Sequence, residues 1–320
     1  MAVYTHISSS QLRDFTAYYD IGEIISCIGI VEGIENTNFL LITSTSRFIL
    51  TIFEKRVQTS DLPFYLGLMD YLSLKGFPCA RPVQRKDGKI WGKIEKKSAA
   101  LITFVSGQWP KRINLNHCLK VGHILAKLHI TGSDFKIKRK NNLSVETWQP
   151  LLKTCLKQNN LSNNLKIENL AGVIEHLKNN WPNNLPTGPI HGDLFPDNVL
   201  FHKKNISGVI DFYFASTDAF AYDLAISLNA WCFDEKGRFF AERARALINS
   251  YTEVRKLNSR ELEAIPIFAT GASVRFLLTR IYDWFNGTQS KMSKKKNPMP
   301  YVKRLEFHLS SNTLQHYGLD

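Results

Sequence analysis

The first hundred residues alternate short apolar runs with turn-forming residues. Four runs rich in β-branched and aromatic residues favour strands; they cover residues 23–31, 38–43, 48–53 and 99–105. Over residues 61–75 apolar positions recur every three or four residues, a spacing that predicts a helix, and Gly76 ends it. Ser8 and Gln11 have the spacing of a capping box that opens a shorter helix. These residues predict a mostly antiparallel sheet with a packed helix.

From about residue 106 the pattern changes to helical spacing. The predicted helices cover residues 117–130, 145–155, 167–180, 218–231, 237–251, 259–286 and 299–309. Two short strands at 199–201 and 208–210 interrupt them as a hairpin. We therefore expect an α+β fold with an N-terminal lobe of residues 1–105 and a mainly helical C-terminal lobe of residues 106–320.

Composition narrows the class of protein. A chain of 320 residues with 44% apolar and 22% charged residues is ordinary for a globular enzyme. The net charge of +13 comes from short, separated basic runs that aromatic residues do not interleave. This favours a solvated surface that also suits anionic small ligands, so no nucleic-acid partner is expected. A polyanion-binding protein remains the alternative.

Cysteine usage and the absence of targeting signals indicate the compartment. The five cysteines are scattered without a C-x-x-C pair, which argues against a disulfide framework and a zinc site. The first residues lack a basic start followed by an apolar run, and uninterrupted apolar stretches are too short to cross a bilayer. We expect a cytoplasmic protein without a membrane partner, as a monomer or weak homodimer.

The segment from His191 to Asp211 carries the strongest chemical signal. Asp193 precedes Asn198 by five positions, and Asp211 follows the predicted hairpin. This is the spacing of the kinase catalytic loop and its magnesium-binding aspartate. Asp193 is predicted to orient an acceptor hydroxyl and take its proton, while His191 braces the loop. The alternative is that these residues only cap a turn.

The same segment predicts the cofactors. Asn198 and Asp211 offer oxygen atoms, the ligands that Mg²⁺ prefers together with phosphate oxygens and water. The predicted cofactors are therefore ATP and Mg²⁺. No G-x-x-x-x-G-K-[ST] loop and no G-x-G-x-x-G fingerprint occur, which argues against P-loop and Rossmann enzymes.

These motifs resemble those of the aminoglycoside phosphotransferase and choline kinase superfamily, whose fold is similar to that of protein kinases. The resemblance lies in HGDLFPDN followed by IDF, in GHILAKLH at 122–129 and in YDLA at 222–225. Within the superfamily, LTIFEKR, DLPFYLGLMDYL, IDFYFASTDAFAYDLAISLNAWCF and RFLLTRIYDW resemble bacterial kinase-like homoserine kinases. The likeness covers about residues 1–309. It implies a bilobal protein-kinase-like fold and transfer of the ATP γ-phosphate to L-homoserine in threonine biosynthesis.

Other functions remain open at this point. Choline, ethanolamine or an aminoglycoside is an alternative substrate within the superfamily. A non-catalytic scaffold or basic nucleic-acid-binding protein is the alternative of a different class.

The resemblance also places the ATP contacts in the N-terminal lobe. Gly33, Asn36 and Asn38 lie between the first two predicted strands, where the superfamily covers the phosphates. As a plain hairpin turn this segment would look nearly the same.

The third strand departs from the superfamily pattern. A lysine is expected after Leu50, but Thr51 stands there. Either Lys55 or Arg56 substitutes for it, or the loop backbone carries more of the phosphate charge. Thr103 lies in the predicted hinge that offers backbone groups to adenine.

The substrate pocket is predicted around the helix 271–286. A zwitterionic amino acid needs partners for its carboxylate and its ammonium group. Arg275 and Tyr282 flank one edge of the apolar face of this helix, and Arg280 and Trp284 flank the other. Arg275 is the predicted carboxylate partner. Asp223 or Asp218 is the predicted ammonium partner, and a structural ion pair is the alternative.

Overall fold

The computed structural model describes residues 5–30, 36–54, 57–157, 169–286, 296–311 and 313–319. These residues form two compact units. The sheet unit contains the described residues up to Gly107 together with Ser207–Tyr213. The helical unit contains the remaining described residues, so the boundary falls within one hairpin strand, β8.

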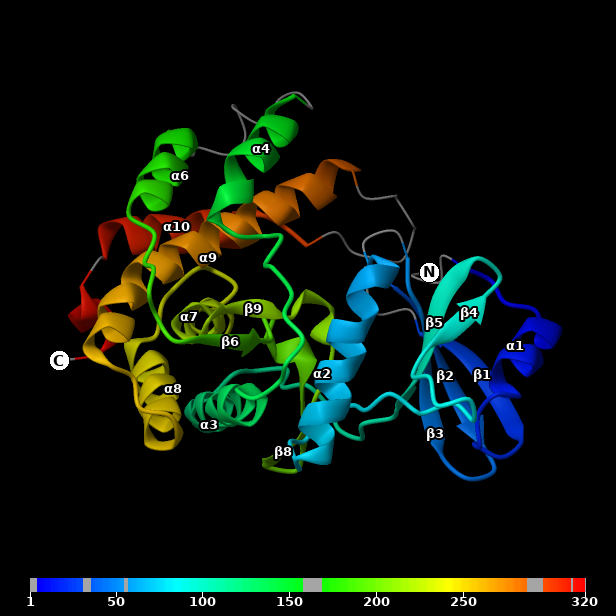
Figure 1. Ribbon diagram of the computed structural model, residues 1–320. Helices are drawn as coiled ribbons and strands as arrows, with labels where there is room; N and C mark the ends of the chain where they lie inside the picture. The colour runs from blue at the N-terminus through cyan, green and yellow to red at the C-terminus, as the bar shows by residue number, and fades with distance from the viewer. Residues whose placement is uncertain are drawn as a thin grey trace. The chain divides into compact units, whose positions relative to one another are not determined.

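The sheet unit is built on a five-stranded antiparallel sheet with the strand order β1-β2-β3-β5-β4 (Figure 1). Its strands are β1 (Ile24–Ile30), β2 (Thr37–Thr43), β3 (Arg47–Ile52), β4 (Gly92–Ile94) and β5 (Lys97–Thr103). Strand β4 was not predicted, because three residues are too short for an alternation to be recognised.

Two helices belong to this unit. Helix α1 (Ser9–Thr16) begins with the predicted capping box, in which Ser8 and Gln11 bond each other's backbone amides. Its Phe15 joins one buried cluster with Leu41 and Leu50 of the sheet. Helix α2 (Leu62–Leu74), preceded by the single turn η1 (Thr59–Asp61), buries most of its apolar residues.

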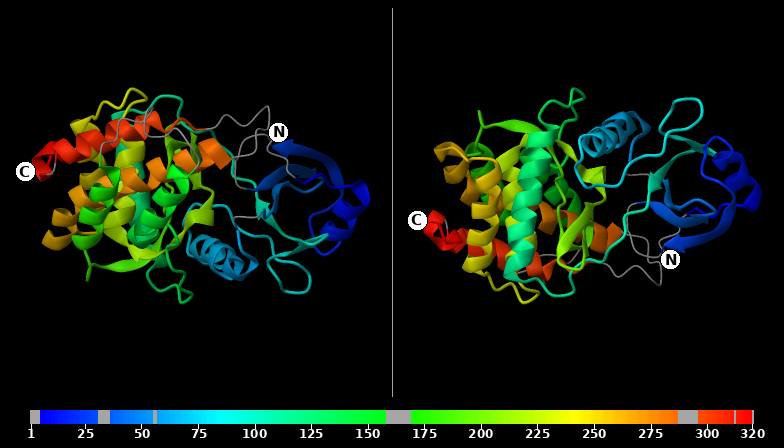
Figure 2. Two further views of the ribbon diagram at one scale, coloured as in Figure 1. Left: turned by 90° about the horizontal axis from the view of Figure 1, so that it is seen from above. Right: turned by 90° about the horizontal axis from the view of Figure 1, so that it is seen from below.

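The helical unit consists of helices that pack in pairs (Figures 1 and 2). They are α3 (Leu115–Gly132), α4 (Val145–Leu156), α6 (Leu170–Asn179), α7 (Phe220–Trp231), α8 (Ala241–Val254), α9 (Ser259–Asn286) and α10 (Met299–Ser310), followed by the turn η4 (Leu314–Tyr317). Helix α3 lies along α8, α7 lies along α9, and α10 also packs on α9. At Gly122 a Cβ atom would lie 2.0 Å from the Leu247 carbonyl oxygen, so α3 and α8 can approach this closely only with glycine there.

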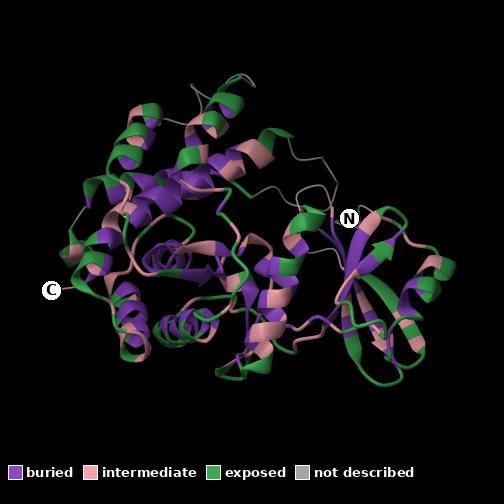
Figure 3. Cartoon of the chain, viewed as in Figure 1, coloured by how far each residue is buried: buried purple, intermediate pink, exposed green. Residues whose placement is uncertain are grey.

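Helix α7 is the centre of this unit, since every one of its residues is buried (Figure 3). Helix α9 is also mostly internal. It is long and apolar enough to span a membrane, but 72% of its most apolar window is buried within the protein.

Two small sheets position the loops of the helical unit. Strand β6 (Thr187–Ile190) pairs with β9 (Ser216–Ala219), and β7 (Val199–His202) pairs with β8 (Asn205–Val209). The β7–β8 hairpin was predicted and the β6–β9 pair was not. The prediction that a helix begins at residue 218 is wrong, because Asp218 pairs with Gly188 in the sheet and α7 begins at Phe220.

Candidate active site

The loop after β6 places Asp193 in a constrained turn. Gly192 has φ 71, in the left-handed region, and a Cβ atom there would lie 2.8 Å from the Phe214 carbonyl oxygen. Only glycine meets both conditions without strain. The single turn η2 (Pro196–Asn198) then leads directly into β7.

Asn198 is fixed against Asp193, as the five-residue spacing suggested. Its side-chain nitrogen donates to the backbone oxygen of Asp193 at 2.8 Å and to the carboxylate Oδ2 at 3.1 Å. Asn198 is 7% exposed. Because both bonds use the amide nitrogen, they leave its carbonyl oxygen for another ligand. That oxygen suits a hard cation such as Mg²⁺.

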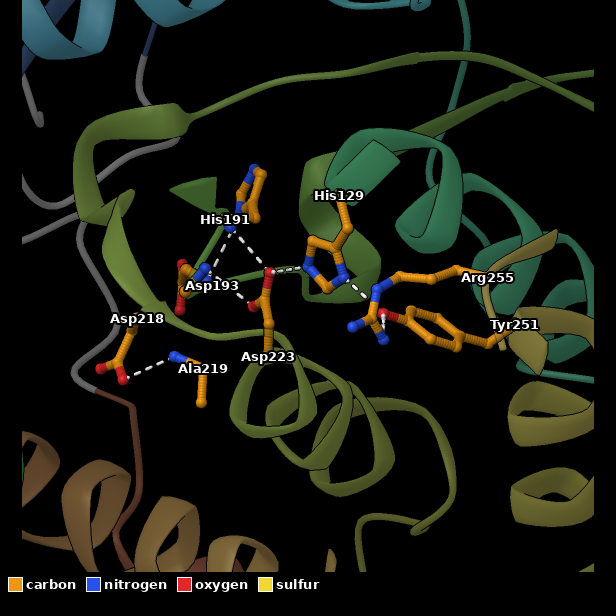
Figure 4. Close-up of polar contacts among 9 residues, drawn as sticks. His129, His191, Asp193, Asp218, Ala219, Asp223, Tyr251 and Arg255 are labelled. Atoms are coloured by element: carbon orange, nitrogen blue, oxygen red, sulfur yellow. Dashed lines mark hydrogen bonds and ion pairs between the residues drawn. The ribbon is translucent and has the colours of Figure 1, made fainter. Parts of the chain in front are cut away.

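Asp223 holds the backbone of the same loop from below (Figure 4). Its Oδ2 accepts from the amide of His191 at 2.7 Å and its Oδ1 from the amide of Gly192 at 2.9 Å. His129, at the end of the G-x-x-L-A-x-L-H segment, bonds the same carboxylate through Nε2 at 3.1 Å. Both oxygen atoms of this fully buried carboxylate are therefore used within the protein.

The chain of bonds continues away from the loop. His129 Nδ1 lies 2.7 Å from the Tyr251 hydroxyl, to which Arg255 donates at 3.2 Å, and Arg255 also pairs with Glu261 at 2.8 Å. Burial lowers the pKa of His129, against the opposing effect of Asp223. Burial alone would raise the pKa of Asp223, but His129, His191 and the Gly192 amide together hold it below its ordinary value.

His191 occupies a bracing position. It is fully buried, and its Nδ1 accepts from the Asp193 amide at 3.3 Å. This contact orders the residue that carries the proposed base.

Asp211 belongs to the sheet unit, whereas Asp193 and Asn198 belong to the helical unit. Its φ of 64 is uncommon for a residue with a side chain, and such strained positions concentrate at functional sites. In the described part of the chain no group of three or more His, Cys, Asp or Glu residues could hold a metal ion. The predicted magnesium ligands are one carboxylate and one amide oxygen, and their pairing stays a prediction.

Two of the predicted ATP contacts meet in the sheet unit. Asn38 of β2 lies opposite Thr51 of β3, and Thr51 donates to Asn38 Oδ1 at 2.8 Å. Asn36 is buried and accepts from the Glu54 amide at 3.2 Å. Gly33 and Lys55 lie outside the described residues, as does Arg56.

Thr103 is the last residue of β5. Its amide donates to the Arg81 carbonyl at 2.8 Å, and its hydroxyl accepts from the Arg81 amide at 2.9 Å. Both groups are engaged within the sheet unit, and contact of this segment with adenine stays a prediction.

The predicted substrate residues differ in burial. Arg275 is 2% exposed and lies near Tyr222 and Asp218, which favours the structural alternative for it. Tyr282 is partly exposed on α9. Asp218 accepts from Asn141 at 2.7 Å. It also accepts from the Ala219 amide at 2.7 Å (Figure 4). Burial raises the pKa of Asp218, and its bond with Asn141 opposes that effect.

The sequence resembles known proteins over most of its length. The model of the family described as "Phosphotransferase enzyme family" matches residues 26–257. This chain belongs to that family. The resemblance to the aminoglycoside phosphotransferase and choline kinase superfamily is thereby confirmed, and the protein is an ATP-dependent phosphotransferase that acts on an alcohol.

Two similar proteins are homoserine kinases. The chain is 45% identical to the homoserine kinase of Paramagnetospirillum magneticum over 326 residues, covering all of both chains. It is 47% identical to that of Nitrobacter hamburgensis over 324 residues, covering 100% of this chain and 98% of the relative.

Solved structures confirm the predicted α+β, protein-kinase-like fold. The amicoumacin kinase hAmiN, in complex with AMP-PNP, Ca²⁺ and Ami, has a TM-score of 0.71 at 18% identity and covers 95% of this chain and 94% of its own. The microcompartment-associated aminopropanol kinase has a TM-score of 0.69 at 17% identity and covers 97% and 100%. At these identities the likeness concerns the fold alone.

The sequence did not predict the hydrogen-bonded network of Asp223, His129, Tyr251 and Arg255 behind the catalytic loop. The segment around His129 was noticed only as part of a motif, and Asp223 was predicted to contact substrate. A histidine at the end of an apolar helix face was the available signal. Its partner Tyr251, and Arg255 which bonds Tyr251, lie too far along the chain for spacing to reveal them.

Proposed function

We propose that the protein transfers the γ-phosphate of ATP to the side-chain hydroxyl of L-homoserine, which gives O-phospho-L-homoserine and ADP. The full-length relatives at 45% and 47% identity support the substrate. One observation carries the chemistry: Asn198 fixes Asp193 while Asp223 holds the backbone amides just before it.

The reaction assigns a role to each group. The acceptor oxygen forms a bond to the γ-phosphorus as the bond to the bridging oxygen of ADP breaks. Asp193 orients the hydroxyl and receives its proton. Because the transition state is loose, correct positioning contributes more than a strong base. His191 and Asp223 act as positioning residues for this loop.

Asn198 and Asp211 would hold Mg²⁺, which neutralises phosphate charge when bound. The amide oxygen of Asn198 and the carboxylate of Asp211 are suitable donors for this hard cation. Asp211→Asn is expected to raise the magnesium concentration needed for half-maximal rate about tenfold or more, as ADP release across a magnesium titration would show. An unchanged requirement would remove Asp211 from the metal site.

The N-terminal lobe of residues 1–105 is the proposed nucleotide-binding part. Asn36, Asn38 and Thr51 are the proposed phosphate-side contacts, and Thr103 belongs to the adenine-side segment. Thr51 stands where a protein kinase has a lysine on its third strand, so Lys55 or Arg56, or the loop backbone, is proposed to supply that phosphate contact. The neutral groups of Asn38 and Thr51 lie beside it on the strands.

Asp218 is the better placed of the two candidates for the substrate ammonium group, because its side chain is partly exposed whereas Asp223 is fully buried. We further propose a cytoplasmic enzyme of threonine biosynthesis, a monomer or weak homodimer without a nucleic-acid partner.

The deciding experiment measures ADP release with magnesium and ATP against L-homoserine, L-serine, L-threonine, choline, ethanolamine and kanamycin. Turnover confined to homoserine is the expected result. ADP release with another alcohol and none with homoserine would contradict the proposed substrate but would still support kinase activity.

A further inference from the structure

A group of cations lies beside the proposed base on α9 and α10. Arg280, Lys296 and Arg304 come from these helices and the residues just before α10. Lys296 forms an ion pair with Asp197 at 3.2 Å. The two arginines have no carboxylate partner among the residues that the structure describes.

Both arginines contact one aromatic ring. The guanidinium of Arg280 lies 4.4 Å from the ring centre of Tyr301, and that of Arg304 lies 4.5 Å from it. Arg304 also lies 5.4 Å from the ring of Phe233. These contacts hold the planar guanidinium groups in place, so little entropy is lost when a ligand binds.

Polar atoms in this cluster lack partners. Arg304 is 8% exposed and its Nε has no hydrogen-bond partner within the described residues; the same holds for the hydroxyl of fully buried Tyr301. Buried donors without acceptors are costly, and a buried guanidinium without an anion is more so. An anionic ligand beside the two guanidinium groups would compensate their charge.

The cluster lies beside the loop that carries Asp193, since Lys296 pairs with Asp197 of that loop at 3.2 Å. Burial lowers the pKa of Arg280, and Arg304 lowers it further, while the charges of Asp193 and Asp197 oppose both effects. Three carbon atoms separate the hydroxyl oxygen of homoserine from its carboxyl carbon. A substrate whose hydroxyl meets Asp193 therefore has its carboxylate within a short reach of that residue.

We propose that Arg280 and Arg304, supported by Tyr301, bind the carboxylate of the amino-acid substrate and select an amino acid over the corresponding amino alcohol. This inference rests on the proposed function, since it assumes a carboxylate-bearing acceptor. It assigns the carboxylate to these two arginines in place of Arg275, whose guanidinium lies beneath the catalytic loop near Gly192 and Phe214.

The test compares L-homoserine with 3-aminopropan-1-ol, which lacks only the carboxylate. Arg280→Met and Arg304→Met keep much of the apolar stem and remove the charge. Each is expected to raise KM for homoserine about 10- to 100-fold with little change in kcat, because a charge-assisted hydrogen bond is lost. The kcat/KM for 3-aminopropan-1-ol and the KM for ATP should stay within about twofold of wild type.

Arg243→Met is the matched control. Arg243 also lies on an aromatic ring, 4.0 Å from the centre of Phe240, and its loss should leave both substrates unaffected. Equal losses on homoserine and on the amino alcohol in the Arg280 and Arg304 variants would overturn the assignment, as would a change confined to the KM for ATP.

Wild-type protein gives a second, independent readout. Homoserine should raise the thermal unfolding midpoint, and the amino alcohol at equal concentration should not. Equal protection by both would count against the arginine site even if Arg304→Met does not fold. A wild type that phosphorylates choline but not homoserine would instead overturn the proposed function.

Discussion

The two regions predicted to meet ATP and its acceptor are built differently. In the helical unit, Asp193 lies on a loop whose backbone is bonded to a charged, fully buried carboxylate. In the sheet unit, the corresponding polar groups are Asn38 and Thr51, two neutral residues on adjacent strands. The position expected to carry a lysine carries Thr51.

This difference separates two ways of positioning phosphate chemistry. Around Asp193, fixed geometry depends on a few charges whose desolvation is compensated by hydrogen bonds. Around Thr51 each neutral hydrogen bond is weaker, so several contacts together must bind the phosphates that a single lysine binds in protein kinases. Substitutions near Asp193 should therefore have large effects and substitutions near Thr51 small ones.

The largest effect is expected at the proposed base. Asp193→Asn should lower kcat by about a thousandfold, because the acceptor proton loses its recipient. ATP affinity should change by no more than about threefold in a nucleotide-binding titration. A kcat near wild type would remove Asp193 from the reaction and erase the contrast between the two regions.

The next largest effect is expected at Asp223, whose carboxylate holds the backbone of the catalytic loop. Asp223→Asn places an amide against the amides of His191 and Gly192, so the loop loses an acceptor. We expect kcat to fall about a hundredfold and the free energy of unfolding to fall by about 3 kcal/mol, measured by ADP release and denaturant titration. Asp134→Asn, at an exposed position, is the control. Loss of stability with unchanged kcat would make Asp223 a purely structural residue.

A smaller effect is expected in the sheet unit. Thr51→Val removes the hydroxyl bonded to Asn38 and should raise KM for ATP about fivefold, the cost of about one neutral hydrogen bond. Thr43→Val removes a hydroxyl that bonds only within a turn of the same sheet, so KM for ATP should not change. An effect of Thr51→Val as large as that of Asp193→Asn would show that the two regions are equally sensitive to substitution.

The smallest kinetic effect is expected at His308, whose ring nitrogens bond Tyr317 and Asn229 within the helical unit. Burial lowers the pKa of this imidazole to about 3 from 6.5. Below pH 6.5 the unfolded chain binds a proton there and the folded protein does not, so stability should fall as pH drops toward 3. His308→Gln should flatten that dependence in thermal unfolding with kcat at neutral pH unchanged. The same flattening in His316→Gln, which is exposed, would contradict the assignment.

The sequence predicted whatever depends on local spacing. The five-position spacing from Asp193 to Asn198 and the hairpin before Asp211 are visible in one short segment. The β6–β9 pair was missed because its four-residue strands contain Gly188, Pro189 and Asp218, which strands usually avoid. The bonds that Asp223 makes within the protein could not be predicted, because its partner His129 lies 94 positions away. The sequence did not single out Arg304, because its proposed role depends on contacts with Tyr301 and Phe233 that form only in the folded protein.

The hydrogen bonds that hold the catalytic loop also affect the order in which the chain folds. The amides of His191 and Gly192 find their acceptor 32 and 31 positions further along, and His129 and Tyr251 meet across 122. Contacts of such sequence separation form slowly, because chain entropy is lost before they are made. During refolding, helices should therefore appear before the catalytic loop is ordered, and recovery of activity should lag behind recovery of helical signal.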